Sequence, residues 1–178
     1  MSALTQSLSL PLFHPNLAAA VLLGIDATAF MDIVALLRQR LLGIASLDYA
    51  LVGRWLGHLP RGTLIHRPIS HSAAIRGEAA LGWVAHYVIG VIFAGVFLAL
   101  AGPHWLGQPT LLPALGFGLL TVLAPFLVLQ PCLGAGIAAR QTPQPGTARL
   151  RSLFAHASFG LGLWLAGMAA TALPWHAG

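Results

Sequence analysis

Four long apolar stretches dominate the sequence and limit the chain to a small set of folds. A helix needs about 20 apolar residues to cross the hydrocarbon core of a bilayer, and each stretch reaches that length. Only 7% of the 178 residues are charged, against roughly 25% in a typical soluble domain, so a water-facing surface cannot be covered. We therefore predict an all-α integral membrane protein, a bundle of four transmembrane helices.

Turn-forming residues set the expected ends of these helices. Gly43, Gly102 and Pro174 follow apolar runs, as residues that stop helices do. The predicted spans cover about residues 17–42, 78–101, 110–139 and 149–173. No internal repeat or composition shift divides the chain, and residues 1–178 are expected to form a single transmembrane domain.

The connection at residues 43–77 is long for a loop between two spans. Leu47, Leu51, Trp55 and Leu59 recur at a spacing of four, while polar residues occupy other faces. This pattern is typical of an amphipathic helix that lies in the membrane interface. We predict a short interfacial helix in this inner-surface connection.

All nine basic residues are arginines, and they flank or fill the first and third connections. Arginine-rich connections stay on the cytoplasmic side, so both termini are expected outside. Trp105 and Trp175 would then lie at the outer interface. The net charge of +5 does not indicate a nucleic-acid partner, because the arginines form no basic domain. The expected partner is the lipid bilayer.

Ionisable side chains inside a span are expensive and mark functional sites. At a rise of 1.5 Å per residue, one polar side chain on each helix falls roughly 8 to 15 Å below the inner surface. These side chains are Asp32, His86, Gln130 and His156. We predict a polar site built from Asp32, His86 and His156.

Further residues complete the predicted site. The second-rank members are Asp26, Glu78 and Gln130, and Asp26 lies about 9 Å further out than Asp32. Arg54 and Arg76 are expected to contact an anion or lipid headgroup at the cytoplasmic mouth. The histidines of the inner connection, His66 among them, match no metal motif and are expected to be solvated.

Several functions fit these residues. The polar groups can simply tie the helices together, since interhelical hydrogen bonds do so in many bundles. The favoured alternative is a small transporter or membrane-embedded binding protein for a small solute, cation or lipid headgroup, whose transport route would need a homodimer. In that case Asp32 accepts a proton or pairs with a cation, because histidine and carboxylate together relay protons near neutral pH.

Two further alternatives involve a cofactor. Asp32, His86 and His156 are suitable ligands for a divalent metal in an enzyme that acts on a lipid or small amphiphile, although no His-box motif is present. His86 and His156 could instead be axial ligands of a haem. The residues do not decide between catalysis and binding.

Several motifs resemble a bacterial inner-membrane family that is catalogued only as a domain of unknown function. They are G-I-D-A-T-A-F-M-D (24–32), D-Y-A-L-V-G-R-W-L-G-H (48–58), G-E-A-A-L-G-W-V-A-H-Y (77–87), P-F-L-V-L-Q-P-C-L-G-A-G-I-A (125–138) and H-A-S-F-G (156–160). The resemblance covers nearly the whole chain and implies a small multi-span protein of the bacterial cytoplasmic membrane. It brings no activity and no assigned site residues.

Overall fold

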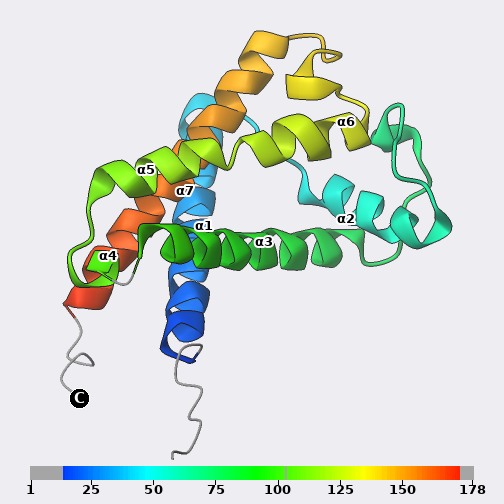
Figure 1. Cartoon of the computed structure of the whole chain (residues 1–178). Coiled ribbons are helices and arrows are strands. Elements are labelled where there is room, and N and C mark those ends of the chain that lie inside the picture. Colours follow the sequence, from blue (N-terminus) through cyan, green and yellow to red (C-terminus); the bar gives the residue numbers. More distant parts are fainter. Residues whose placement is uncertain (1–13, 103, 173–178) are drawn as a thin grey trace, which may run out of the picture.

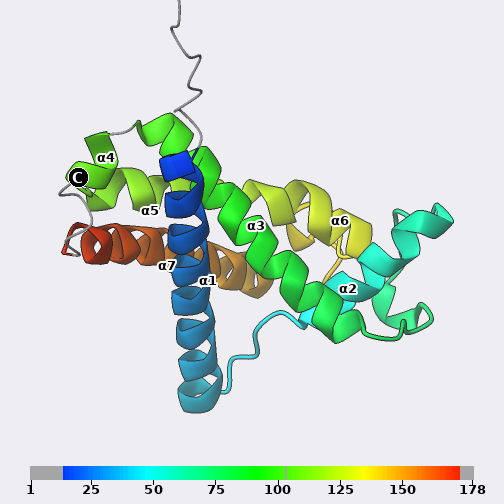
Figure 2. The ribbon, with the colours of Figure 1, turned by 90° about the horizontal axis from the view of Figure 1, so that it is seen from below.

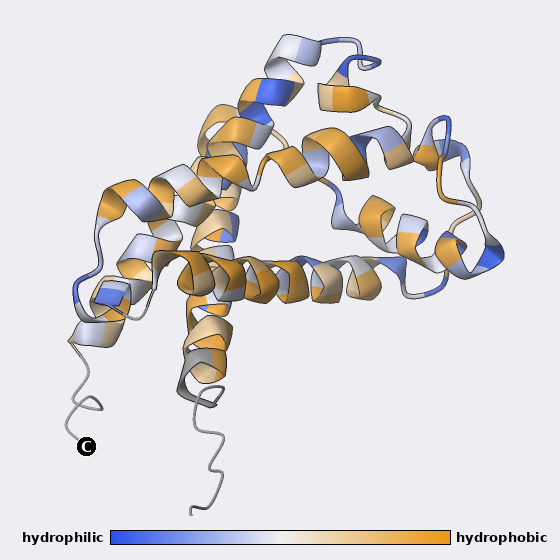
Figure 3. Ribbon diagram, in the orientation of Figure 1, coloured by the Kyte–Doolittle hydropathy of each residue, from blue (hydrophilic) through white to orange (hydrophobic). Residues whose placement is uncertain are grey.

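The computed structural model describes residues 14–102 and 104–172, and the side chains from residue 17 onward within those ranges (Figures 1 and 2). Four helices are long and apolar enough to cross a membrane. Their spans are Leu17–Leu42, Glu78–Ala101, Leu111–Leu133 and Pro145–Thr171. Hydrophobic residues line these segments, while hydrophilic residues gather at the connections (Figure 3). The predicted all-α membrane fold is confirmed.

Shorter helices accompany the long ones. The α-helices are α1 (His14–Leu42), α2 (Tyr49–His58), α3 (Glu78–Ala101), α4 (His104–Gly107), α5 (Leu111–Leu120), α6 (Gln130–Leu133) and α7 (Pro145–Thr171). Single 3₁₀ turns cover Leu59–Arg61, Ile69–His71 and Ile137–Ala139, and a π-helical turn covers Pro125–Leu129.

Helix α1 packs against α3 and α7, α5 packs against α7, and α2 packs against α3. The long helices cross one another instead of running in parallel (Figures 1 and 2). Small residues make the crossings close: a Cβ atom on Gly24 would lie 2.5 Å from the Cα of Val91, and one on Gly162 would lie 2.8 Å from the Cα of Ala27. The core between the helices includes the fully buried Leu163.

The third span covers Leu111–Leu133, so it ends six residues before the predicted end at 139, and its helix is irregular in the middle. Helix α5 ends at Leu120, a π-helical turn begins at Pro125, and α6 ends at Leu133. Pro125 and Pro131 each lack a backbone N–H and interrupt the helical hydrogen-bond ladder. The chain then reverses through Gly134 (φ 90°), and α7 begins at residue 145, four residues before the expected start.

Helix α2 confirms the short helix predicted in the first connection. The Asp48 carboxylate accepts a hydrogen bond from the Ala50 N–H at 2.9 Å and caps its start. The helix does more than lie on a surface, because it contacts α3 backbone to backbone. A Cβ atom on either Gly53 or Gly82 would lie 1.8 Å from a carbonyl oxygen of the opposite helix.

Trp105 and His66 are more deeply buried than the sequence suggested. Trp105 is only 5% exposed and packs edge-on against Phe97, so it belongs to the core. Trp175 lies outside the described residues. His66 is 6% exposed and its backbone N–H donates to the carbonyl of Cys132 at 2.9 Å. This bond joins the first connection to the end of α6, which sequence spacing cannot reveal.

Candidate functional site

Asp32 and His86 meet where α1 crosses α3. The Nε2 atom of His86 donates to Oδ1 of Asp32 at 3.0 Å, and the two side chains are 19% (Asp32) and 11% (His86) exposed. The contact follows from the small residues that precede it on α1. Thr28 turns its hydroxyl back to the Gly24 carbonyl at 2.6 Å and lies against Gly90, so the two helices are close when Asp32 follows one turn later.

Aromatic rings surround His86. Tyr49, the first residue of α2, stacks on the imidazole with ring centroids 4.1 Å apart and an interplanar angle of 27°. Trp83 and Tyr87 of α3 present their rings edge-on, at 5.8 and 5.6 Å. These three rings therefore pack around the imidazole that bonds to Asp32.

Tyr49 itself stays protonated. Burial, together with the nearby Asp32 carboxylate, raises the pKa of the Tyr49 phenol above its ordinary value. Its hydroxyl therefore remains a hydrogen-bond donor across the physiological pH range.

The second oxygen of the Asp32 carboxylate has no partner. Oδ2 is buried and accepts no hydrogen bond within the described part of the chain. A buried, unpaired carboxylate oxygen costs about 1 to 3 kcal/mol, or more when it is charged. A proton, a water molecule or a small cation bound at Oδ2 would remove that penalty.

His156 of α7 forms its hydrogen bond with Thr121, the residue that follows α5. The Thr121 hydroxyl donates its one proton to the Gly118 carbonyl at 2.6 Å, so it must accept from Nδ1 of His156 at 2.7 Å. This bond ties α7 to the residue that caps the end of α5. In a neutral ring, Nε2 then carries the free lone pair.

The second-rank residues lie apart from the Asp32–His86 pair. Gln130 donates from Nε2 to the Ser152 hydroxyl at 3.2 Å, and its buried Oε1 has no partner among the described residues. Asp26 is exposed on the outside of α1. Glu78 starts α3, eight residues before His86, which corresponds to about 12 Å along the helix.

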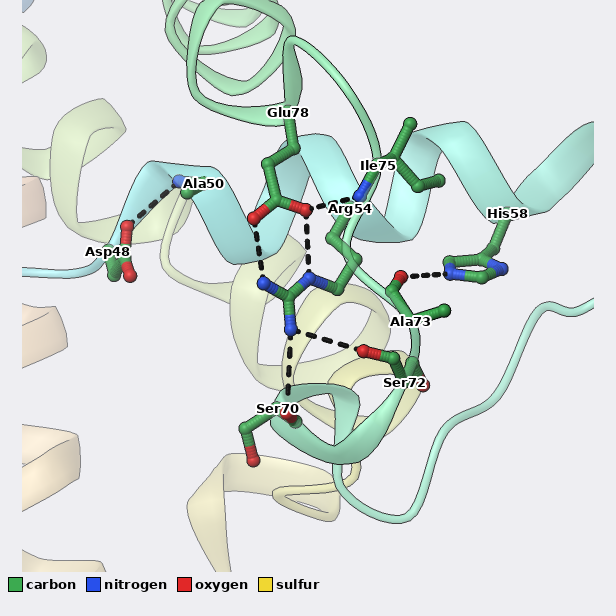
Figure 4. A network of polar contacts seen from close by, with 9 residues as sticks. All are labelled: Asp48, Ala50, Arg54, His58, Ser70, Ser72, Ala73, Ile75 and Glu78. Carbon is green, nitrogen blue, oxygen red and sulfur yellow. Dashed lines mark hydrogen bonds and ion pairs between the residues drawn. The ribbon is translucent and has the colours of Figure 1, made fainter.

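Glu78 forms a bidentate ion pair with Arg54 of α2 (Figure 4). The Nε and Nη2 atoms of Arg54 donate to the two carboxylate oxygens at 2.9 and 2.7 Å. Oε2 also accepts from the Ile75 N–H, and Nη1 of Arg54 donates to the carbonyls of Ser70 and Ser72. The hydrogen bond with Glu78 is the main reason that the pKa of Arg54 is raised.

This network commits Arg54 to the fold of the first connection. Its guanidinium holds the loop at residues 70–75 against the start of α3, and its Nε, Nη1 and Nη2 atoms all make bonds within the chain. Arg76 is exposed and directly precedes Gly77, the N-cap residue of α3. Of the two arginines predicted to contact an anion, Arg76 is the accessible one.

The chain matches the sequence model of a family described as Protein of unknown function (DUF2938) over residues 21–170. The chain belongs to the DUF2938 family. No curated protein matches it, and no solved structure does. The resemblance inferred from the motifs is confirmed, and the family membership assigns no activity to any residue of this DUF2938 protein.

The described part of this DUF2938 chain contains no set of side chains that could together hold a metal. Within residues 14–102 and 104–172, no group of three or more His, Cys, Asp and Glu side chains could hold an ion. Haem ligation by both histidines is also poorly supported, because Nε2 of His86 is already bonded to Asp32. Neither cofactor alternative gains an observation from the structure.

Sequence reasoning missed the partners of each polar side chain. Trp83 and Tyr87 could have been found, because they lie three residues before and one residue after His86 on one helix. Tyr49 and Thr121 could not, since they reach the histidines only through the contacts of α2 with α3 and of α5 with α7.

Proposed function

We propose that this protein is a small transporter or membrane-embedded binding protein of the bacterial cytoplasmic membrane. Asp32 and His86 bind its proton or small cation. The pair is reached from the cytoplasm, and both termini of the chain lie outside. This orientation is supported by the arginines, which flank or fill the first and third connections between the spans.

The observation that carries the proposal is the state of the Asp32 carboxylate. One oxygen accepts from His86, and the other is buried and accepts no hydrogen bond from the residues that the structure describes. A pure tie between helices needs only the first of these bonds. The unpaired oxygen can bind one proton or one cation. Polar groups of this kind inside spans commonly serve proton or ion pathways.

His86 supplies the second half of the proposed site. When it is protonated, it forms an ion pair with Asp32 and stacks on the face of Tyr49. When it is neutral, its Nε2–H still donates to Asp32, and the carboxylate keeps a negative charge for a cation at Oδ2. Proton and cation would therefore compete for one carboxylate.

A large solute is less well supported than a proton or a small cation. Two shallow, open hollows lie elsewhere on the described surface, one of about 280 Å³ beside Thr142, Thr147 and Arg151 and one of about 190 Å³ at Leu37 and Leu41. Neither is lined by Asp32 or His86. The proposed ligand is accordingly of the size of a proton or a monatomic cation.

Reconstituted protein tests the proposal directly. Liposomes that contain pyranine would report proton entry after an acid step outside, with valinomycin and K⁺ to balance charge. In parallel, the thermal unfolding midpoint of protein in nanodiscs would be followed against pH and against added Li⁺, Na⁺ and Mg²⁺. We expect the wild type to show a proton flux or a midpoint shift that Asp32→Asn and His86→Gln abolish.

Asp48→Asn is the control, because it removes a carboxylate that lies outside the spans, and asparagine can still cap the start of α2. It should retain the wild-type response. Circular dichroism and gel filtration establish that each variant is folded. Two site variants are used so that the test still stands if one of them does not fold. The proposal is overturned if the wild type shows neither response, or if folded Asp32→Asn responds as the wild type does.

A further inference from the structure

Asp26 lies on an exposed side of α1, within a helix that is long and apolar enough to cross a membrane. It is nine residues from one end of the Leu17–Leu42 span and sixteen from the other. Within the described residues its side chain makes no ion pair or hydrogen bond. A charged side chain at this depth costs several kcal/mol when lipid surrounds it. A polar partner at Asp26 would therefore be more favourable than hydrocarbon.

The residues around Asp26 form a regular seam along α1. Positions 22, 26, 29, 33, 36 and 40 are separated by four, three, four, three and four residues, and they are Leu22, Asp26, Ala29, Ile33, Leu36 and Arg40. Five of the six are exposed, and Ala29 is half-buried. Alternate spacings of three and four give the 3.5-residue period of a left-handed helix pair.

This seam faces away from the core of the protein. Ala20, Leu23 and Ala27 are buried and face α3 or α7. At 100° per residue, the seam is on the opposite side of the α1 cylinder from this buried stripe. A second helix can therefore lie along the seam without displacing any helix of the chain.

We infer that the seam is the interface of a homodimer, in which α1 of one copy packs in parallel against α1 of a second copy. The two Asp26 carboxyls then face each other across the two-fold axis. When both are protonated, each donates one hydrogen bond and accepts one, so the pair leaves no charge in the hydrocarbon. Each copy contributes one half of this site.

A second copy fits Asp26 better than other occupants do. Both copies insert with the same orientation, so a two-fold axis along the membrane normal brings identical depths together. None of the nine arginines lies within ten residues of Asp26 along the chain, and among the described residues no basic side chain pairs with it. Ala29, next in the seam, is small enough to let the two backbones approach.

The inferred dimer leaves the Asp32–His86 pair outside the seam. Arg40 ends the seam near the arginine-rich surface, where a long side chain can extend to the headgroups and keep its charge hydrated. The dimer interface and the proposed proton site are therefore separate, and each can fail without the other.

Oligomeric state in the membrane tests the inference. Labelled protein would be diluted in liposomes over several protein-to-lipid ratios, and its subunits counted by single-molecule photobleaching. We expect a dimer whose dissociation constant rises about 3- to 30-fold in Asp26→Leu, from the loss of an interhelical hydrogen bond. Asp26→Asn keeps a donor and an acceptor and should remain close to the wild type.

Ile92→Leu on α3 is the control for a lipid-facing substitution, since Ile92 is 56% exposed and outside the seam. It should dimerise as the wild type does. A wild type that remains monomeric at every ratio overturns the inference. So does an Asp26→Leu variant with the wild-type dissociation constant.

Cysteine cross-linking locates the interface independently. In a Cys132→Ala background, which removes the one native cysteine, Ala29→Cys and Leu36→Cys should form intermolecular disulfides in the membrane. Val84→Cys, on the exposed face of α3, should not. Equal cross-linking at Val84 and Ala29, or a cross-link at Val84 alone, would contradict the seam.

Discussion

The imidazole of His86 donates from Nε2 to Oδ1 of Asp32 at 3.0 Å, which joins α1 to α3 by a hydrogen bond one turn beyond their closest packing. The two residues are 54 positions apart in the sequence. Tyr49 of α2 stacks on the same imidazole and adds a third helix to the contact. The stability of this part of the fold should therefore depend on these three side chains together.

A double-mutant cycle measures the Asp32–His86 bond. We expect Asp32→Ala and His86→Ala, each of which removes the bond, to be coupled by about 0.6 to 1.7 kcal/mol, the range of interhelical hydrogen bonds in membrane proteins. Reversible unfolding in mixed micelles gives the four free energies. A pairing of Asp26→Ala with His86→Ala is the control and should be additive, because Asp26 lies on another face of α1.

Tyr49→Phe should alter the stability of the protein at alkaline pH. The pKa of the phenol is raised in the fold above its ordinary value of 10.0. The unfolded chain therefore loses this proton first, and Tyr49 contributes stability that is complete below about pH 10 and lost as pH rises further. Unfolding midpoints between pH 8 and 11.5 should fall less steeply in Tyr49→Phe, which retains the ring stack. Identical slopes would refute this account.

Gly82→Ala should destabilise the packing of α2 on α3. The added Cβ would lie 1.8 Å from the Tyr49 carbonyl oxygen, so one backbone must shift. We expect a loss of about 1 to 3 kcal/mol in the free energy of unfolding. The matched control is Gly116→Ala in α5, where nothing lies within 4 Å, and it should stabilise the helix by up to about 1 kcal/mol.

Thr121→Val should weaken the contact between α5 and α7. The variant keeps the shape of the side chain but leaves Nδ1–H of His156 without its acceptor. A loss of about 0.6 to 2 kcal/mol is expected in the free energy of unfolding. Thr121→Ser retains the hydroxyl and should lose less. If the serine and valine variants are equally unstable, the missing methyl packing and not the hydrogen bond explains the effect.

Arg54→Lys should loosen the first connection although it preserves the charge. A lysine cannot donate to both oxygens of Glu78 and to the carbonyls of Ser70 and Ser72 at once. Limited proteolysis at residues 59–77 should be faster in this variant than in Arg61→Lys, an exposed control. Exchanging the partners, Arg54→Glu with Glu78→Arg, should not restore protection, because the carbonyl bonds stay broken.

The predicted spans and the observed ones agree where local chemistry decides them. Residues 78–101 match α3 at both ends, since Gly77 and Gly102 adopt positive φ and interrupt the helix. The third span ends earlier than the apolar run does, because Gly134 adopts a positive φ and ends α6 while apolar residues continue to Ala139. The sequence also could not predict which polar groups pair with each other, because the rotation of each helix and the crossing angles between helices depend on the tertiary packing.

The sequence alone determined that this chain is a helical membrane protein, since hydrophobic length and scarcity of charge act residue by residue. It also singled out Asp32, His86 and His156, because a polar group in an apolar run is visible without a fold. Only the tertiary structure decided their partners: Asp32 with His86, and His156 with Thr121. Those pairings depend on which small residues let two backbones approach, and such contacts join segments that are far apart along the chain.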